Sequence, residues 1–358
     1  MVLAFAGDST ITKFLLIYNT IISKNGCKYT IIFPNMQILG DFFILFVEKM
    51  ELCNICCNFC VAAGILSEQK HMNNYFQQLF AIFKKFLYLC SVQTSIDHIV
   101  RRLLPCYPPH EARELAYWIV EETTGLNRFD IRTHKGEMDI PDLDEIIGKL
   151  LNHVPVQYIF GHTQWMGMQL RVSPATLIPR PETAELVEAV SSRRSTASVL
   201  DIGTGSGCIA LALKQRHPEW TVHGLDKSRE ALEVAKLNAK NLGLDVHFFT
   251  TDILQDEIGE YDIIVSNPPY VRPSERSTMT ENTLLHEPHD ALFVPEDDPL
   301  LFYRRIAALH KAPELWFEIN ENMGSRMLAL MQQSGYKAEC LNDIYGKQRF
   351  IHATRLPA

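Results

Sequence analysis

Arginine is missing from the first hundred residues of this 358-residue chain, because all 18 arginines lie at or after Arg101. A mitochondrial transit peptide is rich in arginine, so this absence argues against one. Long hydrophobic runs are also missing: the longest uncharged stretch near the N-terminus, Leu52 to Ser67, has 16 residues. A membrane-spanning helix needs about 20 mostly apolar residues. The first 22 residues have no basic cluster and contain Asp8, which disfavours a secretory signal. We therefore expect a cytoplasmic protein without a membrane span.

An excess of positive charge is lacking too. The chain has 34 Lys and Arg against 42 Asp and Glu, a net charge of −8. This balance argues against a protein whose main task is to grip nucleic-acid phosphates, although a local basic groove stays open. An apolar fraction of 47% with 21% charged residues is ordinary for a globular protein and excludes collagen-like, coiled-coil and disordered classes. The length predicts two domains, with room for an appendage.

Residues 1–71 differ in composition from the rest. They are rich in Phe, Ile, Asn and Cys and contain five acidic and five basic residues. They are an atypical extension, for which two interpretations stay open: it lies outside the working protein, with Met72 as the true start, or its Phe, Ile and Leu residues pack onto the helical domain. Mass spectrometry of the native N-terminus tests the first. Four of their cysteines have the spacing of paired metal ligands: Cys53, Cys56, Cys57 and Cys60. Their neighbours are apolar and no second pair lies nearby, so we expect inert thiols and no metal site.

The remaining chain predicts three parts. Residues 72–160 have helical periodicity and predict a small helical domain, one helix of which ends at Gly125. Residues 161–190 alternate and turn like a β-hairpin with a linker. Residues 191–358 alternate strands and helices, which is typical of a doubly wound, mostly parallel α/β sheet. Seven strands are expected, the last two as an antiparallel pair: 198–202, 221–226, 245–252, 261–266, 314–319, 336–341 and 348–354.

A glycine-rich loop follows the first strand of this sheet. Asp201 is followed by Gly203, Thr204, Gly205, Ser206 and Gly207. Closely spaced glycines let the backbone approach a ligand, and the helix that follows offers free N–H groups. The spacing is G-x-G-x-G, whereas a dinucleotide fingerprint would need its third glycine at Cys208. The loop therefore disfavours NAD and suits S-adenosylmethionine (SAM); a tight turn without a ligand is the alternative.

The next two strands end in further candidate cofactor contacts. Asp226 lies 19 residues after Gly207, where an acid can accept hydrogen bonds from both ribose hydroxyls of an adenosyl group. Helix capping is the alternative role for it. Asp252 ends the third strand and can reach the adenine amino group, while Ile253 can pack on the ring.

The fourth strand ends in Asn267, Pro268, Pro269 and Tyr270. The two prolines fix an extended loop and donate no backbone hydrogen bonds. The Asn267 side-chain oxygen and the Pro268 carbonyl can both accept from one NH₂ group, and Tyr270 offers a flat face. This pattern predicts a site for a planar amide or aminopurine nitrogen.

With these motifs the chain resembles the HemK-type N5-glutamine methyltransferases of peptide chain release factors. The likeness covers about residues 72–358 and includes Leu177 to Thr183, Asp201 to Gly207, Asn267 to Tyr270, and His286-Glu287-Pro288. His286 and Ile253 depart from the family, which often has an aromatic residue at these positions.

The resemblance implies methyl transfer from SAM to the glutamine side-chain amide in the GGQ motif of class I release factors. It also implies that the helical domain docks the substrate protein. Asn267, Pro268 and Tyr270 would be catalytic, and the N-P-P-Y residues would bind the substrate. Asn267 would also contact the cofactor, and no direct nucleic-acid partner is expected. Three alternatives remain: another protein glutamine such as that of a ribosomal protein, adenine N6 of DNA, and a non-catalytic binding module.

Overall fold

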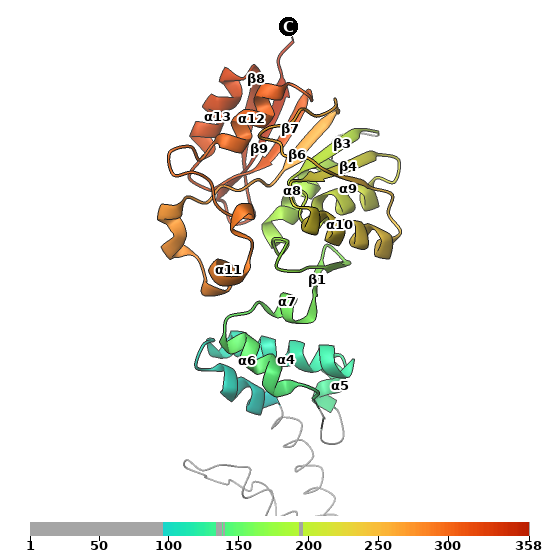
Figure 1. The fold of residues 1–358 in the computed structure, drawn as a ribbon, viewed down its shortest axis with the longest axis vertical. Coiled ribbons are helices and arrows are strands. Elements are labelled where there is room, and N and C mark those ends of the chain that lie inside the picture. The colour runs from blue at the N-terminus through green and yellow to red at the C-terminus, as the bar shows by residue number, and fades with distance from the viewer. Residues whose placement is uncertain (1–95, 134–137, 139, 193–195, 358) are drawn as a thin grey trace, which may run out of the picture. The chain divides into compact units, whose positions relative to one another are not determined.

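The computed structural model describes residues 96–133, 138, 140–192 and 196–357 (Figure 1). The predictions for residues 1–71, for the Cys53–Cys60 cluster and for a helix beginning at Met72 lie outside the described residues.

Helices make up the first part of the described chain. Residues 96–103 are helical and are followed by α4 (Pro109–Thr124), α5 (Arg128–Thr133), α6 (Leu143–Leu151) and α7 (Val156–Phe160). They share one apolar core in which Leu103, Ile119 and Ile147 are fully buried. The helix α4 ends where the sequence predicts. Gly125 adopts φ 72°, and its N–H donates to the Glu121 carbonyl, which closes the last turn.

A hairpin and a helix connect these helices to the sheet. Strands β1 (His162–Trp165) and β2 (Met168–Arg171) pair antiparallel through a two-residue turn. Met166 and Gly167 both have positive φ, the geometry whose twist suits a tight hairpin. The helix α8 (Pro181–Ser191) then begins with proline in its first turn, where the missing N–H is harmless.

The second part is a seven-stranded mixed sheet in the order β5-β4-β3-β6-β7-β9-β8, and β9 is its antiparallel member (Figure 1). All seven strands lie within a residue or two of their predicted positions, so the predicted doubly wound α/β fold is confirmed. Their bounds are β3 (Ser198–Ile202), β4 (Thr221–Asp226), β5 (His247–Thr250), β6 (Ile263–Ser266), β7 (Glu314–Glu318), β8 (Tyr336–Asn342) and β9 (Gln348–Arg355).

Helices cover both faces of this sheet. One apolar core joins the sheet to α8, α9 (Cys208–Arg216) and α10 (Arg229–Leu242). The other joins it to α12 (Leu301–Leu309) and α13 (Gly324–Gln333). Neighbouring residues of one strand serve opposite cores: Trp316 belongs to the first and Phe317 to the second, and both are fully buried. Strands covered on both faces read as continuous apolar runs, which is why the sequence pattern located them.

A segment of short helices lies between β6 and α12. It comprises η1 (Pro273–Thr278), α11 (Glu281–His286) and η2 (His289–Ala291). No helix of the described residues combines the length and the apolar character needed to cross a membrane.

The strand register brings the predicted motifs to one edge of the sheet. Ile202, the last residue of β3, pairs with Leu225 of β4 and with Ser266 of β6, and Ser266 pairs with Phe317 of β7. The residue after each of these therefore lies at the same level. Gly203, Asp226, Asn267 and Glu318 thus meet at the carboxyl ends of neighbouring parallel strands, where open α/β sheets bind ligands.

Candidate active site

The glycine loop is held by its neighbouring strand. The backbone N–H groups of Gly203 and Thr204 both donate to the Leu225 carbonyl at 2.9 Å. Gly207 adopts φ 83°, and an added Cβ there would lie 3.1 Å from Ala235 Cβ and from Phe248 Cζ. The positive φ and these close contacts with α10 and β5 both favour glycine at this turn.

Asp201 is a fully buried acid beneath the loop. Its Oδ2 accepts from Thr204 Oγ1 at 2.6 Å, whereas Oδ1 accepts no hydrogen bond of standard geometry from the described residues. Burial raises the pKa of this carboxyl to about 7, and the charge of Asp226 adds to the rise. The hydroxyl of Ser206 is also buried without a described partner. Both side chains are thus closed off from solvent beneath the glycine loop.

Asp226 lies at the end of β4 as predicted, and it also shapes the loop. Its Oδ2 accepts from the Gly205 N–H and its Oδ1 from the Ser228 N–H, both at 2.9 Å. Burial raises its pKa, and the two backbone N–H groups oppose that rise. The cap of α10 is Ser228, whose hydroxyl accepts from Ala231 N at 3.1 Å. Asp226 therefore ties the glycine loop to β4, and its contact with ribose stays a prediction.

Asp252 and Ile253 follow β5 on the same edge. The Asp252 carboxylate accepts from Leu254 N at 3.0 Å and from Gln255 Nε2 at 2.7 Å, so both oxygens stabilise their own turn. Ile253 is 6% exposed and packs within the core on the α12 side. The predicted contacts of these two residues with adenine remain predictions.

Asn267 has a defined amide orientation. Its Nδ2 donates to Thr183 Oγ1 at 3.2 Å, and Thr183 in turn donates to Glu318 Oε2 at 2.7 Å. Since the nitrogen faces Thr183, Oδ1 is left to accept from an incoming group. Tyr270 follows two residues after Pro268 and donates its hydroxyl to Glu318 Oε1 at 3.3 Å.

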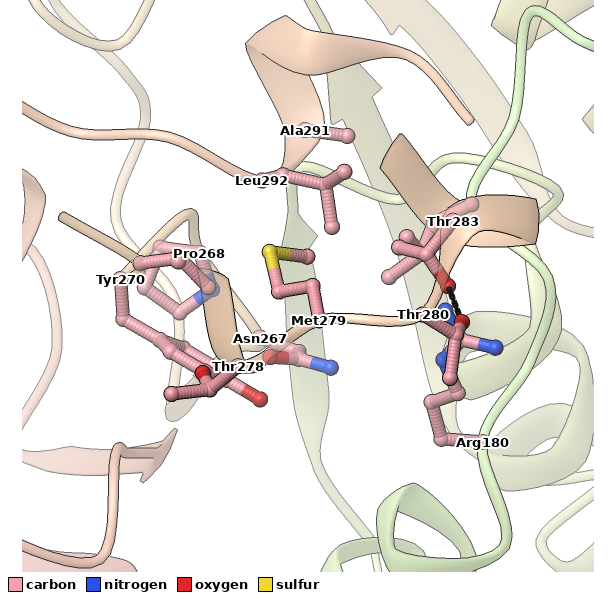
Figure 2. Close-up of a pocket in the computed structure, with 12 residues that line it drawn as sticks. Arg180, Asn267, Pro268, Tyr270, Thr278, Met279, Thr280, Thr283, Ala291 and Leu292 are labelled. Atoms are coloured by element: carbon pink, nitrogen blue, oxygen red, sulfur yellow. Dashed lines mark hydrogen bonds between the residues drawn. The ribbon is translucent and has the colours of Figure 1, made fainter. Parts of the chain in front are cut away.

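Asn267, Pro268 and Tyr270 line one cavity of about 320 Å³ (Figure 2). Pro269 does not line it. The other lining side chains come from the loop before α8 and from the segment between β6 and α12: Leu177, Arg180, Val271, Thr278, Met279, Thr280, Thr283, Ala291 and Leu292. Most of this lining is apolar, with a few polar groups, which is the usual make-up of a small-molecule or side-chain pocket.

Glu287 of the His286-Glu287-Pro288 motif has a structural role, because it links two segments that form the walls of this cavity. Its side chain is 2% exposed and pairs with Arg180 Nη2 at 2.6 Å. It also accepts from Ile178 N at 3.3 Å and from Thr283 Oγ1 at 3.1 Å. One buried carboxylate thus joins the loop before α8 to α11.

Three further residues of the site were not predicted: Thr183, Glu318 and Asn238. Asn238 of α10 exchanges two hydrogen bonds with the Arg171 backbone and donates to the Ser206 carbonyl at 2.9 Å. The signal for Glu318 was an acid at the carboxyl end of a central strand whose three inner residues are apolar. The signal for Asn238 was a polar residue on the buried face of an amphipathic helix.

Comparison with known proteins matches this geometry. Residues 181–295 match the Methyltransferase small domain family. A release factor glutamine methyltransferase of Bacteroides thetaiotaomicron is 40% identical over 274 residues, which cover 72% of this chain and 98% of that protein. The chain belongs to the release factor glutamine methyltransferase family. Two other members show the same likeness. The protein of Flavobacterium psychrophilum is 38% identical over 270 residues, covering 70% of this chain and 95% of its own. The protein of Streptococcus pneumoniae is 41% identical over 218 residues, which cover 58% of this chain and 78% of that protein.

Membership of the release factor glutamine methyltransferase family places the observed geometry in a chemical context. The matched range 181–295 contains the glycine loop, Asp226 and the N-P-P-Y loop. The cavity beside Asn267 is therefore the candidate acceptor site of a methyltransferase.

Proposed function

We propose that this chain transfers a methyl group from SAM to the side-chain amide nitrogen of a glutamine in a peptide chain release factor. One observation carries the proposal: Asn267 lines a cavity next to Pro268, after the strand adjacent to the glycine loop, and its amide oxygen accepts no hydrogen bond from the part of the chain that the structure describes. Family membership supports the same reaction.

The residues at the edge of the sheet fit the cofactor. Gly203 and Gly205 of the glycine loop adopt positive φ, and no described atom lies within 4 Å of where a Cβ would stand on either, so a ligand can approach this backbone closely. Asp226 would accept from ribose hydroxyls, with Asp252 and Ile253 near the adenine. SAM, when bound, supplies an electrophilic methyl group.

The chain's own contribution is to orient the acceptor amide. An amide nitrogen is a weak nucleophile because its lone pair is delocalised into the carbonyl. If Asn267 Oδ1 and the Pro268 carbonyl accept its two N–H groups, the nitrogen points toward the donor, and the developing positive charge is stabilised. Holding both reactants in one geometry contributes about 7–11 kcal/mol in well-aligned systems. Asn267 cannot accept the proton as a base, so the proton leaves to water after transfer.

The protein partner would be a class I release factor with its GGQ glutamine in the cavity, and a cytoplasmic site of action follows from that substrate. The helices of residues 96–160 would help dock it. In support, the wall of the cavity touches them: His286 Nε2 lies 2.9 Å from the Asn152 carbonyl oxygen, and Glu281 Oε2 lies 2.7 Å from His153 Nε2. A protein bound to these helices would thereby be held beside the acceptor site.

The experiment is incubation of the chain with methyl-labelled SAM and a class I release factor. We expect label in the intact factor and none in a factor whose GGQ glutamine is replaced by glutamate. A ribosomal protein and adenine-containing DNA serve as the competing substrates. Preferential labelling of either one, or equal labelling of the two release factors, would contradict the proposal.

A further inference from the structure

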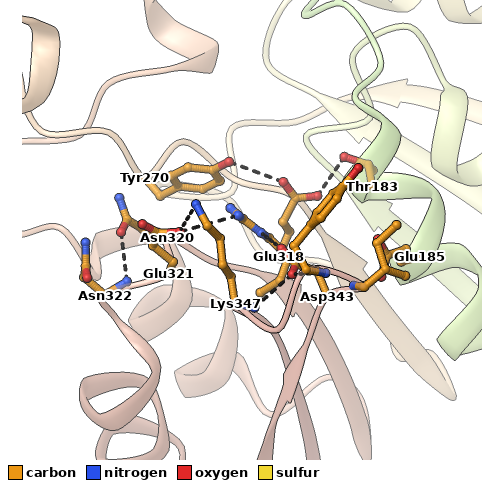
Figure 3. Close-up of polar contacts among 12 residues, drawn as sticks. Thr183, Glu185, Tyr270, Glu318, Asn320, Glu321, Asn322, Asp343 and Lys347 are labelled. Atoms are coloured by element: carbon orange, nitrogen blue, oxygen red, sulfur yellow. Dashed lines mark hydrogen bonds and ion pairs between the residues drawn. The ribbon is translucent and has the colours of Figure 1, made fainter. Parts of the chain in front are cut away.

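A buried acid lies directly behind the proposed acceptor site. Glu318 ends β7, and the register places it beside Asn267 at the end of β6, since Ser266 pairs with Phe317. Its side chain accepts from Thr183 Oγ1 on one oxygen and from Tyr270 Oη on the other (Figure 3). The residue is 2% exposed. A buried carboxylate with a perturbed pKa beside a cavity is a candidate for a functional role.

The hydrogen bonds around Thr183 form a relay with one direction. A threonine hydroxyl has one proton to donate. Because an ionised Glu318 can only accept, Thr183 must give that proton to Oε2 at 2.7 Å. Its oxygen then only accepts, and among the described residues it accepts from Asn267 Nδ2 at 3.2 Å. The other side of the Asn267 amide, Oδ1, is left for the acceptor site.

We propose that Glu318 is a positioning residue, whose carboxylate fixes the amide orientation of Asn267 through Thr183. The proposal deepens the proposed function and rests on it, because it explains how the acceptor oxygen is kept facing the substrate nitrogen. Glu318 touches neither substrate nor cofactor in this scheme.

Protonation of Glu318 reverses the relay. A neutral carboxyl group has a proton of its own to donate, so it can donate to Thr183, whose hydroxyl can then turn toward Asn267. The Asn267 amide would then rotate so that its oxygen accepts from Thr183. This rotation would turn the Asn267 NH₂ group toward the acceptor site. Two donors would then face each other there, and the substrate amide would lose a partner.

The surroundings of Glu318 shift its protonation to a pH near 7. Burial raises the pKa of Glu318 to about 7, while the Thr183 hydrogen bond and the positive charge of Arg349 oppose the rise. The titratable groups that act on Glu318 or feel its charge come from several elements: Glu182 of α8, Cys208 of α9, Tyr270 after β6, Tyr303 of α12 and Arg349 of β9. Arg349 is the cation among them, and it also pairs with Asp343 at 3.2 Å.

The test compares variants of the full-length enzyme at saturating SAM and release factor. Glu318→Gln keeps the shape but adds donors, so we expect kcat to fall at least tenfold while the Kd for SAM stays within twofold. Thr183→Val removes the hydroxyl that links Glu318 to Asn267, so its kcat should fall by a similar factor. Thr183→Ser keeps this hydroxyl and should retain most of the wild-type kcat. The double variant Glu318→Gln/Thr183→Val should be no worse than either single one, because both break the same relay.

The pH dependence of kcat distinguishes a positioning role of Glu318 from a role in stability alone. The kcat of the wild type should rise with pH around 7, and this step should be absent from Glu318→Gln. Asp201 is intact in both proteins, so their difference isolates Glu318. Glu314→Gln is the matched control, since Glu314 is 5% exposed at the opposite end of the same strand. It should lower the melting temperature and leave the pH profile of kcat unchanged.

A second readout does not depend on turnover. The side-chain amide signal of Asn267 in a ¹⁵N NMR spectrum should shift between pH 6 and 8 in the wild type and stay constant in Glu318→Gln. A Glu318→Gln variant with wild-type kcat and an unchanged pH profile would overturn the inference while leaving the proposed function intact. If that variant does not fold, a Thr183→Val enzyme with wild-type kcat would overturn it equally. A wild type that labels no release factor would instead overturn the proposed function and this inference with it.

Discussion

Arg180 Nη2 and Glu287 Oε1 lie 2.6 Å apart, although 107 positions separate the two residues in the chain. The Glu287 side chain is 2% exposed and that of Arg180 is 35% exposed, so the pair is closed to water on the carboxylate side. Both residues belong to segments that line the acceptor cavity or flank it. The pair therefore sets the distance between two walls of the site.

Breaking this pair should loosen the cavity. Glu287→Gln would remove the charge and leave Arg180 without its anion, so we expect a loss of about 1–2 kcal/mol in the free energy of unfolding, after allowance for the exposure of Arg180. The KM for release factor should rise more than the Kd for SAM. Chemical denaturation and steady-state kinetics measure these effects. Asp290→Asn is the control, because the ion pair of Asp290 with Lys227 is exposed and should contribute less than about 0.5 kcal/mol.

Asn267→Ala should reduce turnover far more than SAM affinity. Its amide oxygen acts on the acceptor nitrogen as charge develops, so its contribution belongs to the transition state. Loss of one such group costs on the order of 3 kcal/mol, about a hundredfold in kcat. Single-turnover methylation with saturating release factor measures it. More than half of the wild-type rate would show that Asn267 does not act on the acceptor.

Asp226→Ala should have the opposite effect. The variant loses the expected ribose contact and also the bond that holds Gly205 N, so SAM binding should weaken by about 1.5–3 kcal/mol. Turnover should largely recover at saturating cofactor. Titration calorimetry gives the affinity, and Asp245→Ala, an exposed acid after α10, is the control. Unchanged affinity would restrict Asp226 to a role in the turn that leads into α10.

Asp201 predicts how stability depends on pH. Burial raises its pKa to about 7, whereas the unfolded chain releases this proton near 3.8. The stability that Asp201 contributes is therefore complete below about pH 4 and is lost as pH rises through about 7. Asp201→Asn has no such titration, so its melting temperature relative to the wild type should rise from pH 5 to pH 8. Thermal unfolding of the cofactor-free proteins measures this, and a constant difference would contradict it.

The strands and the chemical motifs of this protein could be predicted because their signals are local. The central strands β3 and β6 are short and mostly apolar, and β3 and β4 occupy the predicted positions to the residue. The N-P-P-Y loop follows a buried strand directly, so its place at the carboxyl edge of the sheet followed from strand direction alone.

The residues that hold the motifs in place make hydrogen bonds to partners far away in the sequence, which no local pattern reveals. Thr183 meets Asn267 across 84 positions and Glu318 across 135. Asn238 meets the backbone of Arg171 across 67. These partners are set by strand order and register, which become known only once the sheet is assembled. The sequence suggested a ribose contact or a helix cap for Asp226, but not its hydrogen bond from the Gly205 backbone, which depends on how the loop folds back.

The pairing of Ile202 with Ser266 makes β3 and β6 neighbours in the sheet. The glycine loop and Asn267 follow adjacent strands, whose spacing of about 4.8 Å is a constant of sheet geometry. The cavity walls, by contrast, come from the inserted segment between β6 and α12 and from the loop before α8. If SAM binds at the glycine loop and the substrate at the cavity, as proposed, the sheet fixes the distance between them, and the loops determine which substrate fits. An engineer seeking a new methyl acceptor would graft residues 273–292 and leave the strands alone.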